Sequence, residues 1–239
     1  MNDTVIIIPI RLKASRFPNK PFAKIGDLPM FHYIYNRVSN ISGNLFLAIC
    51  DQEVKEYCDK MKLKYIMTDP NHMSGSDRIG EAIKKLEEII KFEYVINVQG
   101  DMPFINANHL KLLKEKLLQF QISTLACPFI NLDEAKNSSK VKVTIDQINS
   151  ASDFSRILDS NLKINENVFH HIGIYAYHKK FLLKFISLAP TQREIDEKLE
   201  QLRIIDTNEI GISIVKEEIL GVDTKEDLDR VNRLILKNE

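Results

Sequence analysis

The feature that most constrains this chain is an alternation, along its first half, of short apolar runs and amphipathic helical patterns. Residues 5–10 read Val-Ile-Ile-Ile-Pro-Ile, a continuous and mostly β-branched run. Such a run is typical of a strand that is buried on both faces of a parallel sheet. Similar runs recur further along the chain, at Leu45–Ile49, Lys64–Met67, Tyr94–Val98 and Ser123–Cys127.

Helical patterns lie between these runs. The clearest covers Arg78–Lys91, where the apolar residues that share one face are Ile79, Ala82, Ile83, Leu86, Ile89 and Ile90. Strands that alternate with helices along the chain favour the α/β class, here a doubly wound, Rossmann-like sheet.

The pattern changes after Asp133. Val141–Ile145 and Gly173–Tyr177 alternate between apolar and polar residues, as half-exposed strands do. We therefore expect an excursion at about residues 134–180 that carries an inserted smaller β-sheet.

Two helices are expected in the last fifth of the chain, because two capping-box patterns occur there, at Thr191–Glu194 and at Thr224–Asp227. The final helix carries an apolar stripe and should pack back on the first half. No repeat or linker interrupts the sequence, so residues 1–239 are interpreted as a single domain.

Composition excludes several classes of protein. Lysine plus arginine equals aspartate plus glutamate at 33 each, so no net field exists to bind nucleic acid. No apolar run approaches the ~18 residues that would span a bilayer, and the N-terminus lacks the pattern of a signal peptide. The three cysteines are scattered without metal-type spacing. We expect a cytoplasmic protein without membrane insertion.

A basic loop follows the first strand. Arg11, Lys13, Arg16 and Lys20 lie within ten residues, and ligands of open α/β sheets bind where such loops leave the carboxyl ends of strands. Arginine and lysine together suit a polyphosphate. The glycine-rich Walker and Rossmann motifs are absent. A solvated surface loop is the alternative interpretation.

Two further segments can face the same edge of the sheet. Ser74–Asp77 is a capping-box pattern for the helix that begins near Arg78, and a helix N-terminus can also bind an anion. Gln99, Gly100 and Asp101 follow the strand at Tyr94–Val98, where glycine permits close approach of a ligand. Asp101 is either a turn former or, opposite a triphosphate, a magnesium ligand.

Polar residues of the second half are harder to assign. His171 and Tyr175 are four residues apart and would share one face of a strand. Taken alone, they could simply belong to an ordinary sheet face, and Glu200 and Gln201 resemble a solvated helix surface.

Six ordered motifs together resemble the 3-deoxy-manno-octulosonate cytidylyltransferases, or CMP-Kdo synthetases. The first loop of this family reads R-x-x-S-[ST]-R-x-P-x-K, and the segment at Arg11–Lys20 is similar to it. The other motifs are Ser74-Gly75-Ser76-Asp77-Arg78, Asn97-Val98-Gln99-Gly100-Asp101, His171-Ile172-Gly173-Ile174-Tyr175-Ala176-Tyr177, Leu199-Glu200-Gln201-Leu202-Arg203 and Gly221-Val222-Asp223-Thr224.

The resemblance implies a nucleotidyltransferase that joins CMP from CTP to an acidic 3-deoxy sugar, with Mg²⁺ as cofactor, as a homodimer, for lipopolysaccharide precursor synthesis. The catalytic residues that it implies are Arg11, Arg16, Lys20, Asp101 and Asp223, with Mg²⁺ on Asp101 and Asp223. Those implied for the nucleotide are Pro9, Ile10, Arg11, Lys20, Ser74, Arg78, Gln99 and Gly100. Those implied for the sugar are Arg16, Gln99, Arg156, His171, Tyr175, Glu200 and Gln201.

The chain departs from the family pattern in three places. Ala14 stands where the family has its first loop serine, and Met102 stands where many members carry glutamate. Residues 157–169 are rich in asparagine and contain no proline or arginine, whereas many members have a proline-rich segment and another basic residue there. Two alternatives therefore remain open: another acid sugar, such as a sialic acid or an 8-amino octulosonate, and a nucleotide-binding regulator without turnover.

Overall fold

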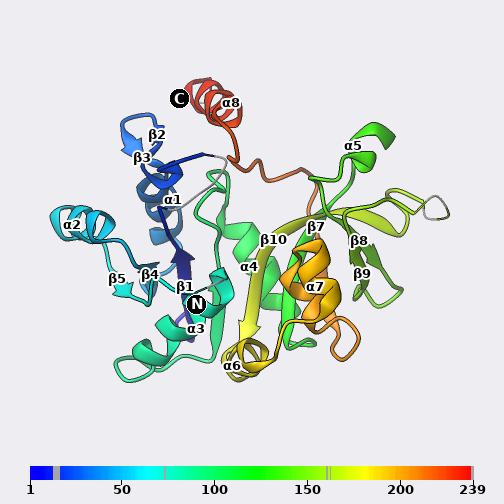
Figure 1. Cartoon of the computed structure of the whole chain (residues 1–239), viewed down its shortest axis with the longest axis horizontal. Helices are drawn as coiled ribbons and strands as arrows, with labels where there is room; N and C mark the ends of the chain where they lie inside the picture. Colours follow the sequence, from blue (N-terminus) through cyan, green and yellow to red (C-terminus); the bar gives the residue numbers. More distant parts are fainter. Residues whose placement is uncertain (13–16, 73, 160, 162, 238–239) are drawn as a thin grey trace. The chain divides into compact units, whose positions relative to one another are not determined.

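The computed structural model describes residues 1–12, 17–72, 74–159, 161 and 163–237, and divides into two compact units. Unit 1 comprises Met1–Ala107 and Ile219–Glu239, and unit 2 comprises Asn108–Glu218. Figure 1 labels the elements along the chain. Unit 2 encloses the expected excursion at 134–180, but whether residues 1–239 fold as one domain stays a prediction.

Unit 1 is built on four parallel strands in the order β6-β1-β4-β5. They are β1 (Thr4–Pro9), β4 (Leu45–Ile49), β5 (Tyr65–Met67) and β6 (Tyr94–Asn97). A small antiparallel hairpin stands apart, made of β2 (Lys24–Ile25) and β3 (Leu28–Pro29). The helices are η1 (Lys20–Phe22), α1 (Met30–Ser39), α2 (Gln52–Met61), α3 (Gly75–Leu86) and α8 (Lys225–Leu236).

The strand order in unit 1 fixes where a ligand can bind. From β1 the chain adds β4 and then β5 on one side, and it later returns to place β6 on the other side. The order therefore reverses between β1 and β6, and the carboxyl ends of strands at such a switch point are where ligands bind in open α/β sheets. Residues 5–8 of β1 are completely buried, which confirms the prediction of a strand covered on both faces.

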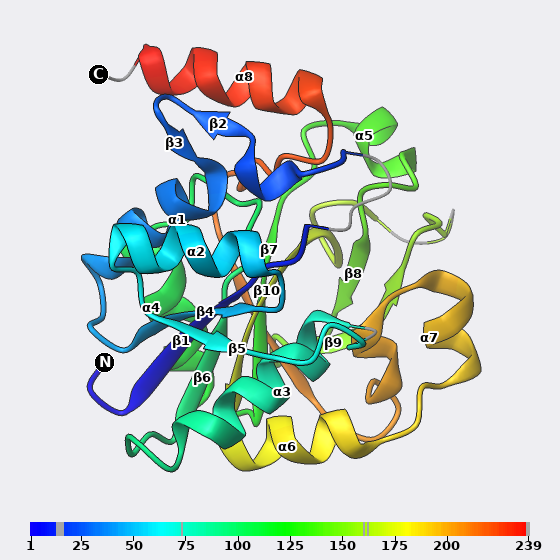
Figure 2. The ribbon, with the colours of Figure 1, turned by 60° about the vertical axis from the view of Figure 1, so that its left-hand side comes forward.

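The C-terminal helix packs against the first half of the chain, as expected. The side chain of Asn232 in α8 accepts a hydrogen bond from the Gly26 N–H (3.0 Å) and donates one to the Lys24 carbonyl (3.1 Å). Figure 2 shows α8 in red beside the β2–β3 hairpin in blue. At its N-terminus both hydrogen bonds of the Thr224–Asp227 capping box are formed, so this prediction is confirmed.

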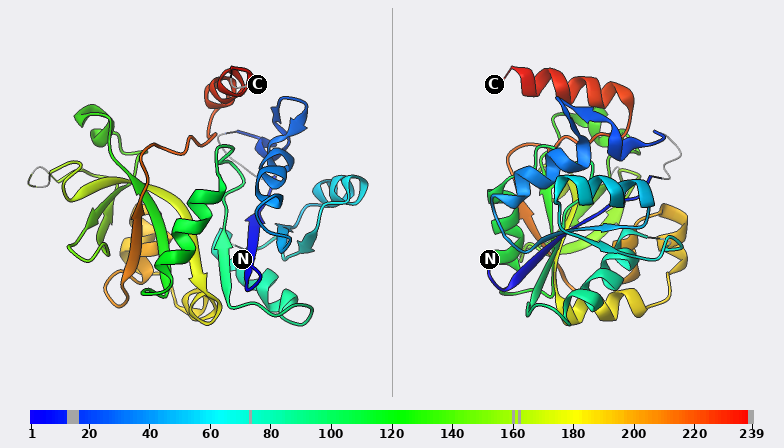
Figure 3. Two further views of the ribbon diagram at one scale, coloured as in Figure 1. Left: turned by 180° about the vertical axis from the view of Figure 1, so that it is seen from behind. Right: turned by 90° about the vertical axis from the view of Figure 1, so that its left-hand side faces the viewer.

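Unit 2 is mainly antiparallel. The 11-residue strand β10 (Val168–His178) pairs with β7 (Ile122–Cys127) on one side and with β8 (Lys142–Ile145) on the other, and Figure 3 shows β10 and β7 in yellow and green. Two further strands are β9 (Ala151–Ser155), next to β8, and β11 (Ile210–Ile214), parallel to β7. The helices are α4 (Ala107–Lys116), α5 (Leu132–Lys136), α6 (Lys179–Ser187), α7 (Gln192–Glu197) and η2 (Glu200–Arg203).

The α/β class, with a parallel-rich sheet and a small separate antiparallel sheet (β2–β3), is thus confirmed, but one helix boundary was predicted wrongly. The pattern at Arg78–Lys91 predicts a helix through Lys91, whereas α3 starts at Gly75 and ends at Leu86. Ile89, which the pattern places on the apolar face, is 72% exposed. Among the helices of the described ranges, none is long and apolar enough to cross a membrane.

Candidate active site

Three of the residues predicted to be catalytic meet at the switch point of unit 1. The Lys20 ammonium donates a hydrogen bond to Asp101 Oδ2 at 2.7 Å and one to Asp223 Oδ1 at 3.2 Å. Lys20 begins η1, Asp101 follows β6, and Asp223 lies just before α8. The Val222 N–H also donates to the Asp101 carbonyl (2.9 Å), which holds the returning chain beside the end of β6.

The charge balance of this cluster matters for what it can bind. Burial opposes a charge on Lys20, but the ion pairs with Asp101 and Asp223 outweigh it and raise the lysine pKa above its usual value. The side chains stay accessible, since Lys20 is 17% exposed, Asp101 29% and Asp223 58%. Among the described residues, one ammonium therefore lies between two carboxylates.

These carboxylates fit a hard divalent cation. Oxygen ligands are what Mg²⁺ prefers, and it is usually held by one or two carboxylates together with substrate phosphates. Within the described ranges, no group of three or more His, Cys, Asp or Glu residues could hold a metal ion. A cation at Asp101 and Asp223 would thus complete its shell with water and phosphate oxygens.

The basic loop begins at the same edge. Pro9 ends β1, Ile10 is 3% exposed, and the Ile10 N–H donates to the Ala48 carbonyl of β4 at 2.9 Å. Arg11 is exposed to solvent. Arg16 and its neighbours Lys13, Ala14 and Ser15 lie outside the residues that the structure describes, so the predicted roles of Arg16 stay predictions.

Gly100 packs closely against the end of β1, and its predicted role in admitting a ligand stays a prediction. A Cβ atom at this position would lie 2.6 Å from Ile10 Cδ1 and 3.4 Å from the Pro9 carbonyl oxygen. The glycine thus lets the turn after β6 pack against the end of β1, which brings Asp101 toward the basic loop. Beside it, the Gln99 side chain donates to Asn97 Oδ1 at 3.4 Å.

Ser74 and Arg78 lie at the start of α3. The Ser74 hydroxyl accepts the Asp77 N–H at 3.1 Å, so it caps the helix. Arg78 is only 2% exposed and donates to the Thr68 hydroxyl at 2.6 Å, which in turn donates to the Ile49 carbonyl. A buried guanidinium is thus fixed near the ends of β4 and β5.

In unit 2, His171 and Tyr175 lie side by side on β10. Their ring centroids are 5.6 Å apart, and Tyr175 stacks on Tyr177 at 5.9 Å. The pairing with β7 is irregular, because Ile172 lies opposite Leu125 but Tyr175 opposite Thr124. The bulge inserts an even number of residues into β10, so side chains on both sides of it keep the same alternation between the two faces of the strand. The prediction that His171 and Tyr175 share one face is therefore confirmed.

These two side chains are neutral. Burial, together with the charge of His170, lowers the pKa of His171 to about 3. Burial raises the pKa of Tyr175 well above 10, and the nearby Tyr177 and Glu200 raise it further. His171 Nε2 lies 3.0 Å from the Thr124 hydroxyl. This face can offer hydrogen bonds but no charge near neutral pH.

Among the buried side-chain nitrogen and oxygen atoms of the described residues, only one, in Gln201, has no hydrogen-bond partner. This residue lies in η2 and is 5% exposed, and its Nε2 is buried with no hydrogen-bond partner. A buried donor that stays unpaired costs free energy. A ligand that offers an acceptor there would remove this cost, which favours the predicted contact between Gln201 and the sugar.

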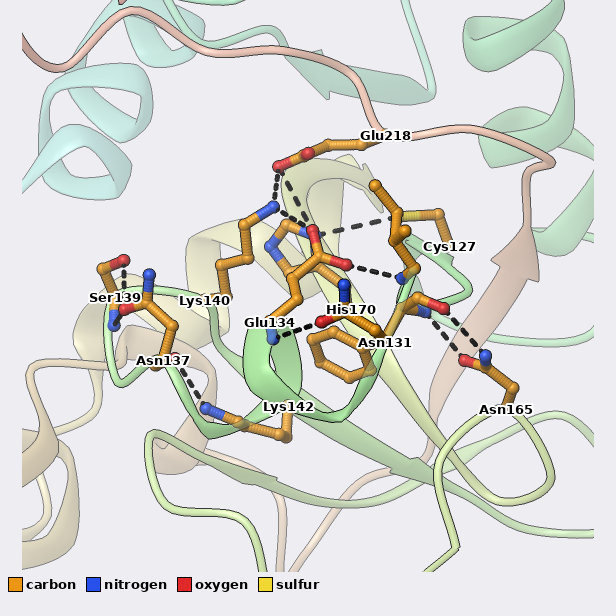
Figure 4. Close-up of polar contacts among 12 residues, drawn as sticks. Cys127, Asn131, Glu134, Asn137, Ser139, Lys140, Lys142, Asn165, His170 and Glu218 are labelled. Carbon is orange, nitrogen blue, oxygen red and sulfur yellow. Dashed lines mark hydrogen bonds and ion pairs between the residues drawn. The ribbon is translucent and has the colours of Figure 1, made fainter.

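Arg156 is held rigidly at the end of β9. Its N–H and Nε donate to the carboxylate and the carbonyl of Glu197, at 3.0 and 2.7 Å. Its own carbonyl accepts a hydrogen bond from the buried Lys142 ammonium at 2.9 Å, and Lys142 also donates to the Asn137 carbonyl. Figure 4 shows the Lys142–Asn137 contact.

A second polar cluster, which no sequence motif indicates, is shown in Figure 4. Lys140 bridges Glu134 and Glu218, with Nζ–Oε1 distances of 2.5 and 2.7 Å, and His170 Nδ1 lies 3.6 Å from the same Glu218 oxygen. Cys127 adjoins His170, but burial raises the pKa of its thiol to about 12. An unreactive thiol and a lysine that bridges two carboxylates indicate a structural cluster.

Comparisons with known proteins agree with this geometry. A family model described as cytidylyltransferase matches residues 5–217. The 3-deoxy-manno-octulosonate cytidylyltransferase of Leptospira interrogans is 38% identical over 238 residues, which cover 97% of this chain and 95% of that protein. The enzyme of the same name from Pseudoalteromonas atlantica is 34% identical over 95% of each chain.

The chain belongs to the 3-deoxy-manno-octulosonate cytidylyltransferase family. It is therefore a nucleotidyltransferase, which confirms the resemblance inferred from the motifs.

Solved structures support the family assignment. A structure of CMP:2-keto-3-deoxy-manno-octonic acid synthetase complexed with CTP matches with a TM-score of 0.89 and 31% identity, over 99% of both chains. The 4-diphosphocytidyl-2C-methyl-D-erythritol synthase of Anaerococcus prevotii matches with a TM-score of 0.64 but only 13% identity. That second likeness shows the shared fold alone.

Proposed function

We propose that this chain transfers CMP from CTP to 3-deoxy-D-manno-octulosonate (Kdo) and releases pyrophosphate. The observation that carries the proposal is the meeting of Lys20, Asp101 and Asp223 where the strand order of unit 1 reverses. Their position at a nucleotide-binding edge, in a chain of this family, supports activation of an acid sugar by CTP.

The reaction needs no side-chain nucleophile. The anomeric hydroxyl of the sugar attacks the α-phosphorus of CTP, the bond from that phosphorus to the bridging oxygen breaks, and the hydroxyl proton is lost to solvent. Since phosphoryl-type transfers depend on positioning and charge neutralisation, cationic side chains are the main requirement. Arg11, Arg16 and Lys20 are proposed to neutralise the phosphates, and Arg16 and Lys20 to stabilise the departing pyrophosphate.

Mg²⁺ is the proposed cofactor, bound by Asp101 and Asp223 with substrate phosphates. When bound, such a cation orients the α-phosphate and lowers the pKa of the attacking hydroxyl. Lys20, which now lies between the two carboxylates, would then donate its hydrogen bonds to phosphate oxygens as well.

The remaining assignments divide between nucleotide and sugar. Pro9, Ile10, Ser74, Arg78, Gln99 and Gly100 are proposed for cytidine, and Arg156, His171, Tyr175, Glu200 and Gln201 for the sugar, with Arg16 and Gln99 shared. The unpaired Gln201 donor and the neutral His171–Tyr175 face support a ligand rich in hydroxyl groups. A homodimer, a cytoplasmic location and a role in lipopolysaccharide precursor synthesis stay predictions.

The experiment is pyrophosphate release by the purified protein with CTP, Mg²⁺ and one sugar acid at a time. We expect the highest kcat/KM with Kdo, and lower values with sialic acid and 8-amino octulosonate. A higher kcat/KM with either competitor would identify that sugar acid, and not Kdo, as the substrate. Tight CTP binding without pyrophosphate release under any sugar would instead indicate a regulator.

A further inference from the structure

Asp51 occupies a helix-capping position without capping the helix. It immediately precedes α2 and has a non-helical backbone (φ −95°, ψ 132°), as an N-cap residue should. Its side chain nevertheless makes no capping hydrogen bond. Elsewhere in the described chain, Ser74, Asn131, Thr191 and Thr224 all accept an N–H of the helix that they precede.

The carboxylate of Asp51 instead reaches back to the first loop. Its Oδ2 accepts the Leu12 N–H at 3.0 Å, across 39 residues of sequence. The Cys50 thiol is close to the same oxygen, at 3.4 Å. Asp51 therefore holds the backbone of the first loop at Leu12 and does not cap its own helix.

The contact continues the pairing of β1 with β4 beyond the end of β4. The Ile6 and Ile10 N–H groups donate to the carbonyls of Asn44 and Ala48, both at 2.9 Å. Leu12 has the next N–H that points the same way in a strand. Because β4 ends at Ile49, the Asp51 carboxylate supplies the acceptor that a longer strand would have supplied.

Arg11 lies between these two anchored N–H groups. Its backbone is therefore fixed on both sides, by Ala48 through Ile10 and by Asp51 through Leu12. We propose that Asp51 is a positioning residue, which holds the start of the basic loop so that Arg11 faces the CTP phosphates. This inference rests on the proposed function, because it assigns the phosphates to that loop.

The test separates this role from helix stability. Asp51→Ser introduces a good N-cap residue whose hydroxyl can cap α2 but is one bond too short to reach Leu12. Asp51→Asn keeps an acceptor oxygen of the same reach and removes only the charge. We expect Asp51→Ser to have an unchanged or higher Tm and about tenfold weaker CTP binding, and Asp51→Asn to bind CTP within about twofold of wild type.

Equilibrium titration with CTP, without sugar, keeps the readout independent of turnover. Asn131→Ala is the control, because it removes a working cap from α5 (Asn131 Oδ1 to the Glu134 N–H, 2.9 Å) and should lower Tm without changing CTP affinity. CTP binding by Asp51→Ser within about twofold of wild type would overturn the inference, as would equal losses in a folded Asp51→Asn protein. A wild-type protein that binds CTP but releases no pyrophosphate would refute the proposed function alone.

Discussion

The two units of the molecule place their candidate residues in opposite ways. In unit 1 the charged residues Lys20, Asp101 and Asp223 lie after β1, after β6 and before α8, at one edge of a parallel sheet. In unit 2 the candidate residues lie within regular structure, with His171 and Tyr175 on β10 and Gln201 in η2.

Their chemistry differs in the same way. Lys20, Asp101 and Asp223 are charged and accessible, and they pair with one another. His171 and Gln201 are buried and neutral, and their polar atoms are held by neighbours or left unpaired. A polyphosphate requires the first kind of surface and a hydroxylated sugar the second, so the contrast supports a division of labour between the units.

The largest effect is expected at the carboxylates of unit 1. Asp101→Asn and Asp223→Asn keep size and capping ability but remove the charge that a hard cation needs. Each should fold normally, bind CTP, and lower Mg²⁺-dependent turnover by about 100-fold or more. Steady-state pyrophosphate release across a Mg²⁺ titration measures this.

The double variant tests whether the two carboxylates share one site. Its loss should be much smaller than the sum of the single losses in free energy. The control is Asp229→Asn, which makes the same change at an exposed position of α8. Full activity in Asp223→Asn would indicate that Asp223 only interacts with the N-terminus of α8. Such an interaction stabilises the folded protein by about 0.3–1 kcal/mol.

A smaller effect is expected at Gln201. Gln201→Leu removes a buried donor that has no partner within the described chain, so the free energy of unfolding should stay the same or rise. If the sugar supplies the missing acceptor, the KM for Kdo should rise about tenfold while CTP affinity is unchanged. Thermal unfolding and steady-state kinetics give both values. An unchanged KM for Kdo would remove Gln201 from the sugar site.

The smallest effect concerns pH and the buried histidines of unit 2. Burial lowers the pKa of His171 to about 3 and that of His170 to about 4, from an ordinary 6.5. Between these values the unfolded chain binds protons that the folded chain does not, so stability falls as pH drops below 6.5. The slope should be about 1.4 kcal/mol per pH unit for each histidine.

Urea unfolding at several pH values measures this slope. His171→Gln should remove part of it, because His170 and His32, whose pKa burial also lowers, still titrate. Carboxylates do not obscure the comparison above pH 4.5, since Glu81, whose hydrogen bonds lower its pKa to about 2, contributes only below its ordinary value of 4.5. A flat stability profile between about pH 6.5 and 5 would contradict the buried, neutral histidines.

The contrast also explains what the sequence could predict. Lys20 and Asp101 could be paired in advance, because loops that follow neighbouring parallel strands emerge at one edge. Gln201 looked like part of a solvated helix, since nothing in the sequence indicates that η2 is a short 3₁₀ helix with this side chain buried. Ile89 fits the helical periodicity of the sequence, but α3 ends before it, at Leu86, and its side chain is exposed.

Long-range polar contacts were the hardest to predict. Asp51 precedes a helix, so its sequence pattern is that of an ordinary cap, yet its partner Leu12 is 39 residues away. Lys140 and Glu218 are 78 residues apart and carry no motif. Such pairs depend on the completed fold and not on local spacing.

CTP titration of two variants tests the division between the units most directly. Lys20→Ala and His171→Ala are each titrated with CTP in the absence of sugar, alongside thermal unfolding to confirm that both are folded. We expect Lys20→Ala to weaken CTP binding about tenfold or more, and His171→Ala to bind within about twofold of wild type while its KM for Kdo rises. Loss of CTP binding in a folded His171→Ala protein, with normal binding by Lys20→Ala, would contradict the division.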